Sequence, residues 1–307
     1  MPRVNNVIQQ VSQLNTYEQG KVFDFLKTVL MSNGITNSID EEIAENRFNK
    51  GKCCPFCNHD KISKYGKYHG KNSVKQRYKC QNAECKKTFN DFSKSPVSSS
   101  KKGLDKWLLY AQCMIDNKTI RKCAEIVEIN IATAFYWRHK ILNCISEFLG
   151  IGSVDGVVEA DEVFFAYSYK GTKPANTPRP SRKRGKQIKK RGISKEQVCV
   201  GTALDREGNI IIELLCTGRV TANELQRLYG NRIGKHSILC TDSHKSYIQF
   251  ATDMELEHKR IKRGRHKEDI YHINHINSLH SNLKRWMSRF NGVATKYLSN
   301  YLKWNKW

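Results

Sequence analysis

The sequence contains no long hydrophobic run and few acidic residues. No stretch approaches the ~20 consecutive apolar residues of a membrane-spanning helix, so we expect no membrane partner. Asp and Glu number 29 against 53 Lys and Arg, which leaves a formal net charge of +24. The first residues also lack the basic, then apolar, pattern of a secretory signal. We therefore expect a protein that stays in the cytoplasm.

A surplus of positive charge this large repels itself unless a polyanion neutralises it. Nucleic acid fits best as the partner, because each neutralised phosphate releases counterions. A basic protein that is merely soluble is the alternative, and the clustering of the charge along the chain argues against it. With 307 residues, the chain can hold one sizeable core and one or two small modules.

Eleven cysteines in a reducing compartment favour metal binding over disulfides. After an N-terminal segment, residues 1–49, whose apolar positions have helical spacing, two cysteine pairs fall within residues 50–95. Four thiolates from two such pairs form the tetrahedral structural Zn²⁺ site of a zinc ribbon. Cysteines in an ordinary core are the alternative, but a segment this short and polar could not fold around a core without metal. The predicted ligands are Cys54, Cys57, Cys80 and Cys85.

Residues 100–150 have an entirely helical pattern. Two helices separated by a tight turn at Glu128-Ile129-Asn130 predict a helix-turn-helix, whose second helix can enter the major groove of DNA. A plain three-helix bundle explains the same pattern equally well. The side chains expected to contact DNA are Thr133, Tyr136, Arg138 and His139.

From residue 155 to residue 307 the pattern changes to strands and helices. The expected order is three strands, a helix, two strands and a closing helix, which predicts a ribonuclease-H-like α/β domain. The fold class is therefore multidomain α/β, with this domain preceded by the ribbon and the helix-turn-helix. The expected strands are Val157–Tyr169, Gln197–Asp205, Ile210–Cys216, Ile238–Thr241 and Leu256–Ile261, and the expected helices are Thr221–Tyr229 and Ile273–Phe290.

Asp161 and Asp242 each follow or end an apolar, strand-like run. Two carboxylates on neighbouring strands, with an oxygen ligand from a helix, suit Mg²⁺, which prefers hard oxygen donors. Such ions can activate a nucleophile and stabilise a leaving oxygen in phosphodiester chemistry. Carboxylates at ordinary strand-end turns are the alternative. In a basic chain, the pair favours an enzyme that cuts and joins nucleic acid.

Three motifs of the sequence resemble those of prokaryotic insertion-sequence transposases of the DDE superfamily. They are Glu159-Ala160-Asp161-Glu162, Thr241–Tyr247, and His275-Ile276-Asn277 followed by Leu283-Lys284-Arg285. The chain is most similar to the branch that has an N-terminal zinc ribbon and a Lys after the third catalytic position. The resemblance implies catalytic roles for Asp161, Asp242, Asn277 and Lys284, with Mg²⁺ or Mn²⁺ bound by the first three.

The resemblance further implies a homo-oligomer that works on double-stranded DNA, both terminal inverted repeats and target, near the nucleoid of a prokaryotic cell.

The departure from the commonest pattern is Asn277, because a neutral amide supplies an oxygen but no charge. Asn277 and Lys284 are seven residues apart, so two helical turns bring them to one face. Glu268 and Asp269 are the fallback for the third ligand, and Glu162 is expected on the opposite face of its strand from Asp161.

Two basic stretches lie near these motifs. The first, residues 172–195, contains no acid and is expected to become ordered on DNA. The second is residues 258–267. The side chains expected to contact DNA are Arg182, Lys183, Arg184, Lys189, Lys190 and Arg191 in the first stretch, and Arg260, Arg263 and Arg265 in the second.

Two other functions remain open on the sequence alone. A non-catalytic DNA-binding regulator could retain the ribbon and the helix-turn-helix beside a decayed catalytic domain, and Asn277 keeps this alternative open. A structure-specific nuclease would cleave DNA without joining it.

Overall fold

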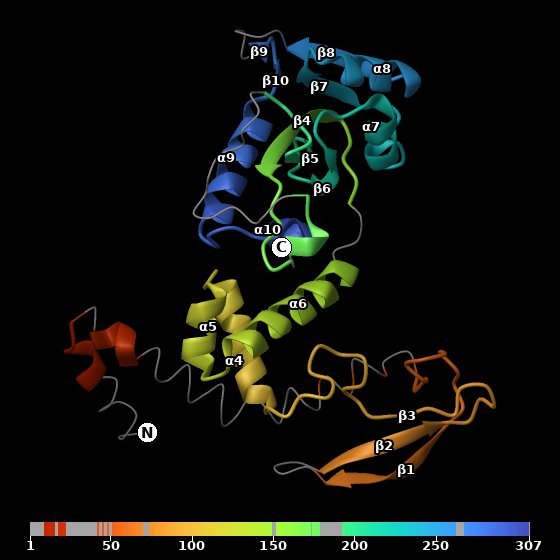
Figure 1. The fold of residues 1–307 in the computed structure, drawn as a ribbon, viewed down its shortest axis with the longest axis vertical. Coiled ribbons are helices and arrows are strands. Elements are labelled where there is room, and N and C mark those ends of the chain that lie inside the picture. Colours follow the sequence, from red (N-terminus) through yellow and green to blue (C-terminus); the bar gives the residue numbers. More distant parts are fainter. Residues whose placement is uncertain are drawn as a thin grey trace. The chain divides into compact units, whose positions relative to one another are not determined.

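The computed structural model describes most of the chain, in the ranges 9–15, 18–22, 51–69, 74–148, 152–172, 174–178, 192–261 and 267–306, with residues 42, 45 and 48. These residues form two compact units, Met1–Ile141 and Leu142–Trp307. Figure 1 shows the elements of both units. None of the helices in the described ranges is long and apolar enough to cross a membrane.

The first unit begins with a small antiparallel sheet. Its strands, in spatial order, are β1 (Ile62–His69), β2 (Val74–Cys80) and β3 (Thr88–Phe89). The sheet covers a cluster of only four buried residues, Cys54, Tyr78, Cys80 and Phe89. A core this small cannot offset the conformational entropy of folding, so a cross-link or a metal is needed to hold this part of the chain together.

Three helices follow, α4 (Leu104–Ile115), α5 (Ile120–Val127) and α6 (Ile131–Phe148). Trp107 of α4 stacks on Trp137 of α6, with ring centroids 3.8 Å apart. The Thr119 side chain caps the start of α5, and Glu128 ends the helix in the left-handed conformation. The two helices and their three-residue turn were therefore correctly predicted, and their binding to DNA stays a prediction.

The second unit is built on a five-stranded sheet with the spatial order β6-β5-β4-β7-β8. The strands β4, β5 and β6 are antiparallel, whereas β4, β7 and β8 are parallel. The mixed α/β architecture of this unit was correctly predicted. The strand bounds are β4 Val157–Ala166, β5 Gln197–Leu204, β6 Ile210–Thr217, β7 Ile238–Asp242 and β8 Glu257–Ile261.

Helices cover both faces of this sheet (Figure 1). On one face, α7 (Ala222–Tyr229) and α8 (Lys245–Asp253) pack on the core that includes Val158 and Ala160 of β4. On the other face, α9 (Asn274–Ser288) lies against β4 and β5. The remaining elements are the strands β9 (Lys267–Glu268) and β10 (Tyr271–His272), the short helices η1 (Pro174–Asn176) and η2 (Thr295–Tyr297), and the last helix, α10 (Leu298–Lys306).

Helix α8 was absent from the expected order, which placed β8 directly after β7. The two strands are parallel, and a parallel pair requires a crossover, which α8 provides. Strand direction cannot be inferred from the local hydrophobic pattern, so the need for the helix was not visible in the sequence.

Candidate active site

Asp161 and Asp242 lie level with one another on adjacent strands. Glu159 of β4 pairs with Cys240 of β7 in parallel register, and each aspartate comes two residues later on its strand. Because side chains alternate along a strand and neighbouring strands are about 4.8 Å apart, the two carboxylates share one face and lie close together. The predicted juxtaposition of the two aspartates is therefore present.

The electrostatics of Asp161 agree with this geometry. The pKa of Asp161 is raised to about 6, mainly by burial and in part by the negative charge of Asp242, whereas a backbone hydrogen bond from Glu162 and the positive charge of Lys284 lower it. Lys284 is an exposed residue of α9, so the helix brings a cation within electrostatic range of the carboxylates. Asn277 is exposed on the first turn of the same helix.

A buried carboxylate, Glu159, fixes the start of α9. The Glu159 side chain is 1% exposed, and its Oε2 accepts a hydrogen bond of 3.0 Å from the backbone N–H of Ile276, next to Asn277. Its Oε1 lies 2.9 Å from the Arg206 guanidinium and 3.2 Å and 3.0 Å from the Nδ1 atoms of His272 and His275. These contacts tie the first turn of α9 to the strand that carries Asp161.

The carboxylate of Glu159 and the two imidazoles could in principle hold a metal, since their ligand atoms lie within 4.8 Å of one another. However, Arg206 Nη1 lies 3.1 Å from His272 Nε2 and 2.6 Å from His275 Nδ1. A guanidinium thus already supplies the positive charge at the place where an ion would lie. We conclude that this cluster, which sequence reasoning missed, positions α9.

His280 was also missed by sequence reasoning. It is a buried residue of α9, and its Nε2 lies 2.6 Å from Thr202 Oγ1, while its Nδ1 lies 3.7 Å from Asp161 Oδ2. Burial, together with the charge of Lys284, lowers the pKa of His280 to about 4. The available signal was its spacing, because His280 follows Asn277 by three residues and precedes Lys284 by four.

Glu162 was expected on the opposite face of its strand from Asp161, and Glu268 and Asp269 were the fallback for the third metal ligand. Glu162 alternates with Asp161 along β4, and burial, with the charge of Asp161, raises the pKa of Glu162 to about 8. Tyr247 of α8 lowers this pKa, which agrees with the expected orientation of Glu162 towards the opposite face. Asp269 is exposed in the turn between β9 and β10, and the Glu268 side chain lies outside the described residues.

The four predicted zinc ligands converge in the first unit. Their sulfur atoms all lie within 4.8 Å of one another, and the pairs Cys54–Cys85 and Cys57–Cys80 are separated by 3.8 Å and 3.6 Å. Tetrahedral Zn–S bonds of ~2.3 Å require sulfurs about 3.8 Å apart, so the donor type and spacing both suit Zn²⁺. The wider gap in the second pair, between Cys80 and Cys85, does not prevent convergence.

The predicted DNA contacts on α6 need one correction. Arg138 is fully buried, and its guanidinium donates to the carbonyl of Lys118 at 2.6 Å and to Cys123 Sγ at 3.3 Å. It therefore holds the helices together and does not present its charge to DNA. His139 is half-buried, and burial lowers its pKa to about 4. Tyr136 is 65% exposed and Thr133 is half-buried, so both stay candidates for contacts.

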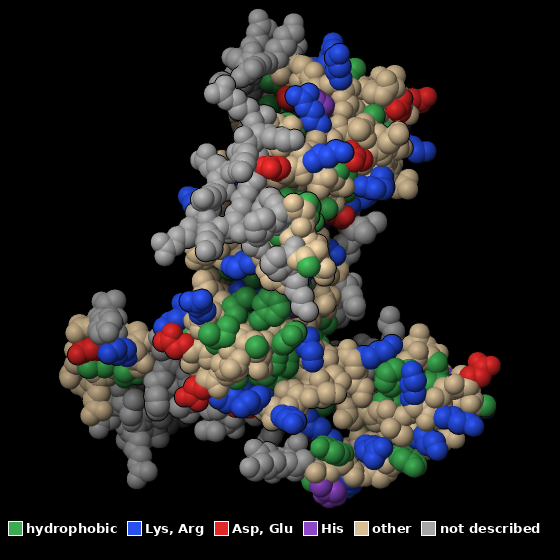
Figure 2. All heavy atoms as spheres, viewed as in Figure 1, with side chains coloured by type: hydrophobic (Ala, Val, Ile, Leu, Met, Phe, Trp, Pro, Cys, Tyr) green, Lys and Arg blue, Asp and Glu red, His purple; other side chains and the backbone are tan. Residues whose placement is uncertain are grey.

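Of the expected basic contacts in the second unit, Arg260 is exposed on β8. The remaining expected contacts, Arg182, Lys183, Arg184, Lys189, Lys190, Arg191, Arg263 and Arg265, lie outside the described residues. In the first unit, Lys and Arg side chains are spread over β1 and β2 (Figure 2). The exposed lysines on and around this small sheet include Lys61, Lys64, Lys67, Lys86 and Lys87.

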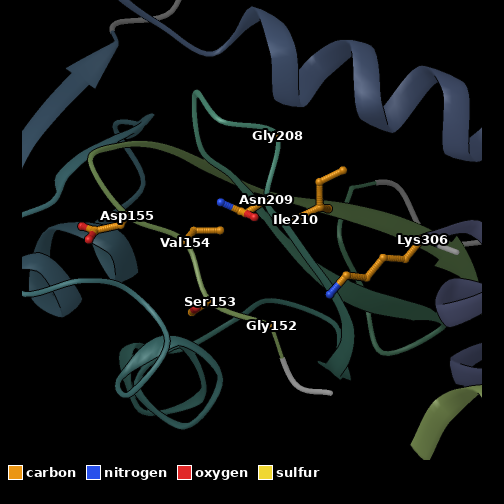
Figure 3. Close-up of a pocket in the computed structure, with 8 residues that line it drawn as sticks. All are labelled: Gly152, Ser153, Val154, Asp155, Gly208, Asn209, Ile210 and Lys306. Carbon is orange, nitrogen blue, oxygen red and sulfur yellow. The ribbon is translucent and has the colours of Figure 1, made fainter. Parts of the chain in front are cut away.

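A cavity of about 440 Å³ lies at the other end of β4 (Figure 3). It is lined by the segment from Gly152 to Asp155, by the turn from Gly208 to Ile210, and by Lys306, which extends from α10. None of Asp161, Asp242, Asn277 and Lys284 lines it. The aspartate pair therefore lies outside this cavity.

Comparison with known proteins agrees with the motifs. Residues 153–307, half of the chain, match the family described as ISXO2-like transposase domain. The chain is also 25% identical over 264 residues to an uncharacterized protein in transposable element ISH50 of Halobacterium salinarum, a match that covers 85% of this chain and 86% of that protein.

Among solved structures, the chain is similar to the Mos1 mariner paired end complex with Mn and to the Mos1 strand transfer complex, at 14% identity in each case. These matches cover 64% and 65% of this chain and 72% and 73% of those chains, with TM-scores of 0.22 and 0.24. Scores this low support no conclusion about the chemistry of this chain.

Proposed function

The chain belongs to the family of ISXO2-like transposases, and on this basis we propose that it binds the terminal inverted repeats of its element and catalyses metal-dependent DNA strand cleavage and strand transfer. The observation that carries the proposal is the pair Asp161 and Asp242, level on adjacent parallel strands beneath the helix that bears Lys284.

The donor set fits a divalent cation. Burial is the main cause of the raised pKa of Asp161, and the charge of the neighbouring Asp242 carboxylate adds to it; a cation between the two carboxylates relieves this repulsion. Asp161 and Asp242 would hold Mg²⁺ or Mn²⁺, with the amide oxygen of Asn277 as the third donor. When bound, the metal supplies activation of the nucleophile and stabilisation of the leaving oxygen.

The other residues of the site bind and orient DNA. Lys284 meets a phosphate beside the carboxylates, and Arg260 extends the basic surface from β8. Asn277 offers an oxygen without a charge, so the third position contributes less to cation binding than a carboxylate would. The 3′-hydroxyl freed by cleavage attacks target DNA in line, and no covalent protein–DNA intermediate forms.

In the first unit, Cys54, Cys57, Cys80 and Cys85 hold a structural Zn²⁺, and the ribbon presents its lysines to the phosphates of the element end. The helix-turn-helix contacts the same DNA, with Thr133 and Tyr136 on its second helix. The protein works as a homo-oligomer on DNA, at the nucleoid of a prokaryotic cell.

Cleavage of DNA that bears the element ends, in Mg²⁺ or Mn²⁺, tests the proposal. Asp161→Asn and Asp242→Asn should each abolish cleavage and leave end binding nearly intact, because each keeps the side-chain volume and removes a charged donor. Asp253→Asn is the matched control, since Asp253 is an exposed aspartate at the end of α8. Cleavage by either site variant at the wild-type rate would contradict the assignment.

A regulator that binds DNA without cutting it is the second candidate, and the neutral side chain of Asn277 favours it. If wild-type protein binds the element ends and never cuts them, with any divalent metal, the regulator is correct.

A further inference from the structure

His280 of α9 lies beside Thr202 of β5 and the carboxylate of Asp161 of β4, the two strands that this helix covers. It is 8% exposed, its Nε2 lies 2.6 Å from Thr202 Oγ1, and its Nδ1 lies 3.7 Å from Asp161 Oδ2. The separation from Asp161 is too long for a hydrogen bond, so the carboxylate does not hold a proton on Nδ1.

The hydrogen bonds determine which ring nitrogen carries the proton. The Thr202 hydroxyl donates its only proton to the backbone carbonyl of Asp161, at 2.7 Å. Thr202 Oγ1 can therefore only accept from His280, so Nε2 carries the proton and Nδ1 carries a lone pair. This lone pair faces the Asp161 carboxylate, and two electron-rich atoms face one another away from bulk water.

A cation bound by both His280 Nδ1 and the Asp161 carboxylate would remove the repulsion between these two electron-rich atoms. We propose that His280 Nδ1 is a direct ligand of the divalent cation held by Asp161, an inference that rests on the function proposed above. Ligand atoms at right angles around an ion with bonds of ~2.1 Å lie about 3 Å apart. Rotation of the Asp161 carboxylate can shorten the distance between Asp161 Oδ2 and His280 Nδ1 from 3.7 Å to this separation.

Two further observations support the assignment. A histidine that binds metal donates its other N–H to an oxygen that fixes the tautomer, and Thr202 provides this acceptor. Asn277, His280 and Lys284 also have the spacing of a single helix face, so the ring lies between the proposed third ligand and the DNA-binding lysine. Carboxylate oxygens alone suit both Mg²⁺ and Mn²⁺. An imidazole nitrogen is a softer donor than oxygen, so a histidine ligand favours Mn²⁺ over Mg²⁺.

The alternative is a histidine that only packs α9 onto the sheet, and His280→Gln separates the two. The amide nitrogen of Gln can keep the hydrogen bond to Thr202, but the side chain lacks a nitrogen at the position of Nδ1. His236→Gln is the matched control, since His236 is an exposed histidine of the same unit.

The test is pulsed electron paramagnetic resonance of the full-length protein titrated with Mn²⁺. The wild type and His236→Gln should show the coupling of a directly bound imidazole nitrogen. His280→Gln should lose this coupling and bind Mn²⁺ about tenfold or more weakly. If circular dichroism shows that His280→Gln is unfolded, Thr202→Val replaces it, and the coupling should then weaken because the tautomer is no longer fixed.

The outcomes distinguish this inference from the function on which it rests. Mn²⁺ that binds in an Asp161-dependent manner without nitrogen coupling, or with coupling that survives His280→Gln, overturns the role of His280 alone. If no Mn²⁺ binds in an Asp161-dependent manner, both the role of His280 and the metal site of the proposed function are wrong.

Discussion

At the scale of single residues, Asn277 is the position on which the catalytic assignment depends most. If its amide oxygen completes the metal site, Asn277→Ala should lower the cleavage rate ~10²-fold, as expected for loss of a positioned catalytic contact. Asn277→Asp should retain activity, because it restores an oxygen donor. Cleavage rates with the element ends measure both effects.

Asn282→Ala is the control for this series, since Asn282 is exposed on another side of the same helix and bonds to Arg285. Full activity of Asn277→Ala combined with an inactive Glu268→Ala would show that the third ligand lies in the β9–β10 hairpin.

His139 provides a second test at this scale. Its pKa is about 4 in the folded chain, below the ordinary value of 6.5, because burial disfavours the charged ring. The unfolded chain therefore binds the proton more readily, and the stability contributed by the neutral ring is present above pH 6.5 and is lost as the pH falls towards 4. In a nuclear magnetic resonance titration of the free protein, the His139 ring should not titrate above about pH 5. A midpoint near 6.5 would mean that the ring is exposed and available to DNA phosphates.

At the scale of elements, the attachment of α9 to the sheet depends on Arg206. Arg206→Met leaves the buried Glu159 carboxylate without its guanidinium partner, which should cost about 3 kcal/mol in the free energy of unfolding of the second unit. Adding Glu159→Gln should recover part of this loss, because the buried charge is then gone. Denaturant unfolding of the four members of the cycle measures the coupling.

Arg219→Met is the matched control for Arg206, since Arg219 is exposed and should change the unfolding free energy by less than about 0.5 kcal/mol. An equal effect of the two substitutions would show that the Glu159 cluster does not hold the helix.

The proposed zinc ribbon is the second element for which a specific result is expected. Cys57→Ser, or removal of zinc by a chelator, should unfold residues 50–95 and leave the second unit folded, because four buried residues cannot stabilise this sheet without metal. Elemental analysis should find one zinc per chain in the wild type. Protein purified without chelator that contains no zinc, yet has a folded ribbon, would refute the site.

The sequence was most informative about elements with a clear period and about motifs on strands. The strands β4 to β8, the closing helix and the convergence of the four cysteines were predicted, because each depends on local pattern and spacing. Helix α8 was not predicted, because it follows from the parallel direction of β7 and β8. The buried roles of Glu159, Arg138 and His280 were also missed, because each depends on partners 15 or more residues away in the chain that no local pattern identifies.

At the scale of the whole molecule, the two compact units contain different sites that the proposed function requires. The first contains the cysteine site, α4, α5 and the larger part of α6, and the second contains the aspartate pair and α9. With a net charge of +24, the chain should bind any DNA at low salt, so only binding that persists at physiological salt and depends on sequence reports recognition of the element ends.

The most direct test of the central claim is a strand-transfer assay with purified protein, Mg²⁺ or Mn²⁺, DNA that bears the element ends, and a target duplex. We predict that the wild type produces both cleaved ends and products in which an element end is joined to target DNA, and that Asp161→Asn produces neither. Cleaved ends without any joined product would instead identify a nuclease, and joined products formed at the wild-type rate by Asp161→Asn would contradict the account.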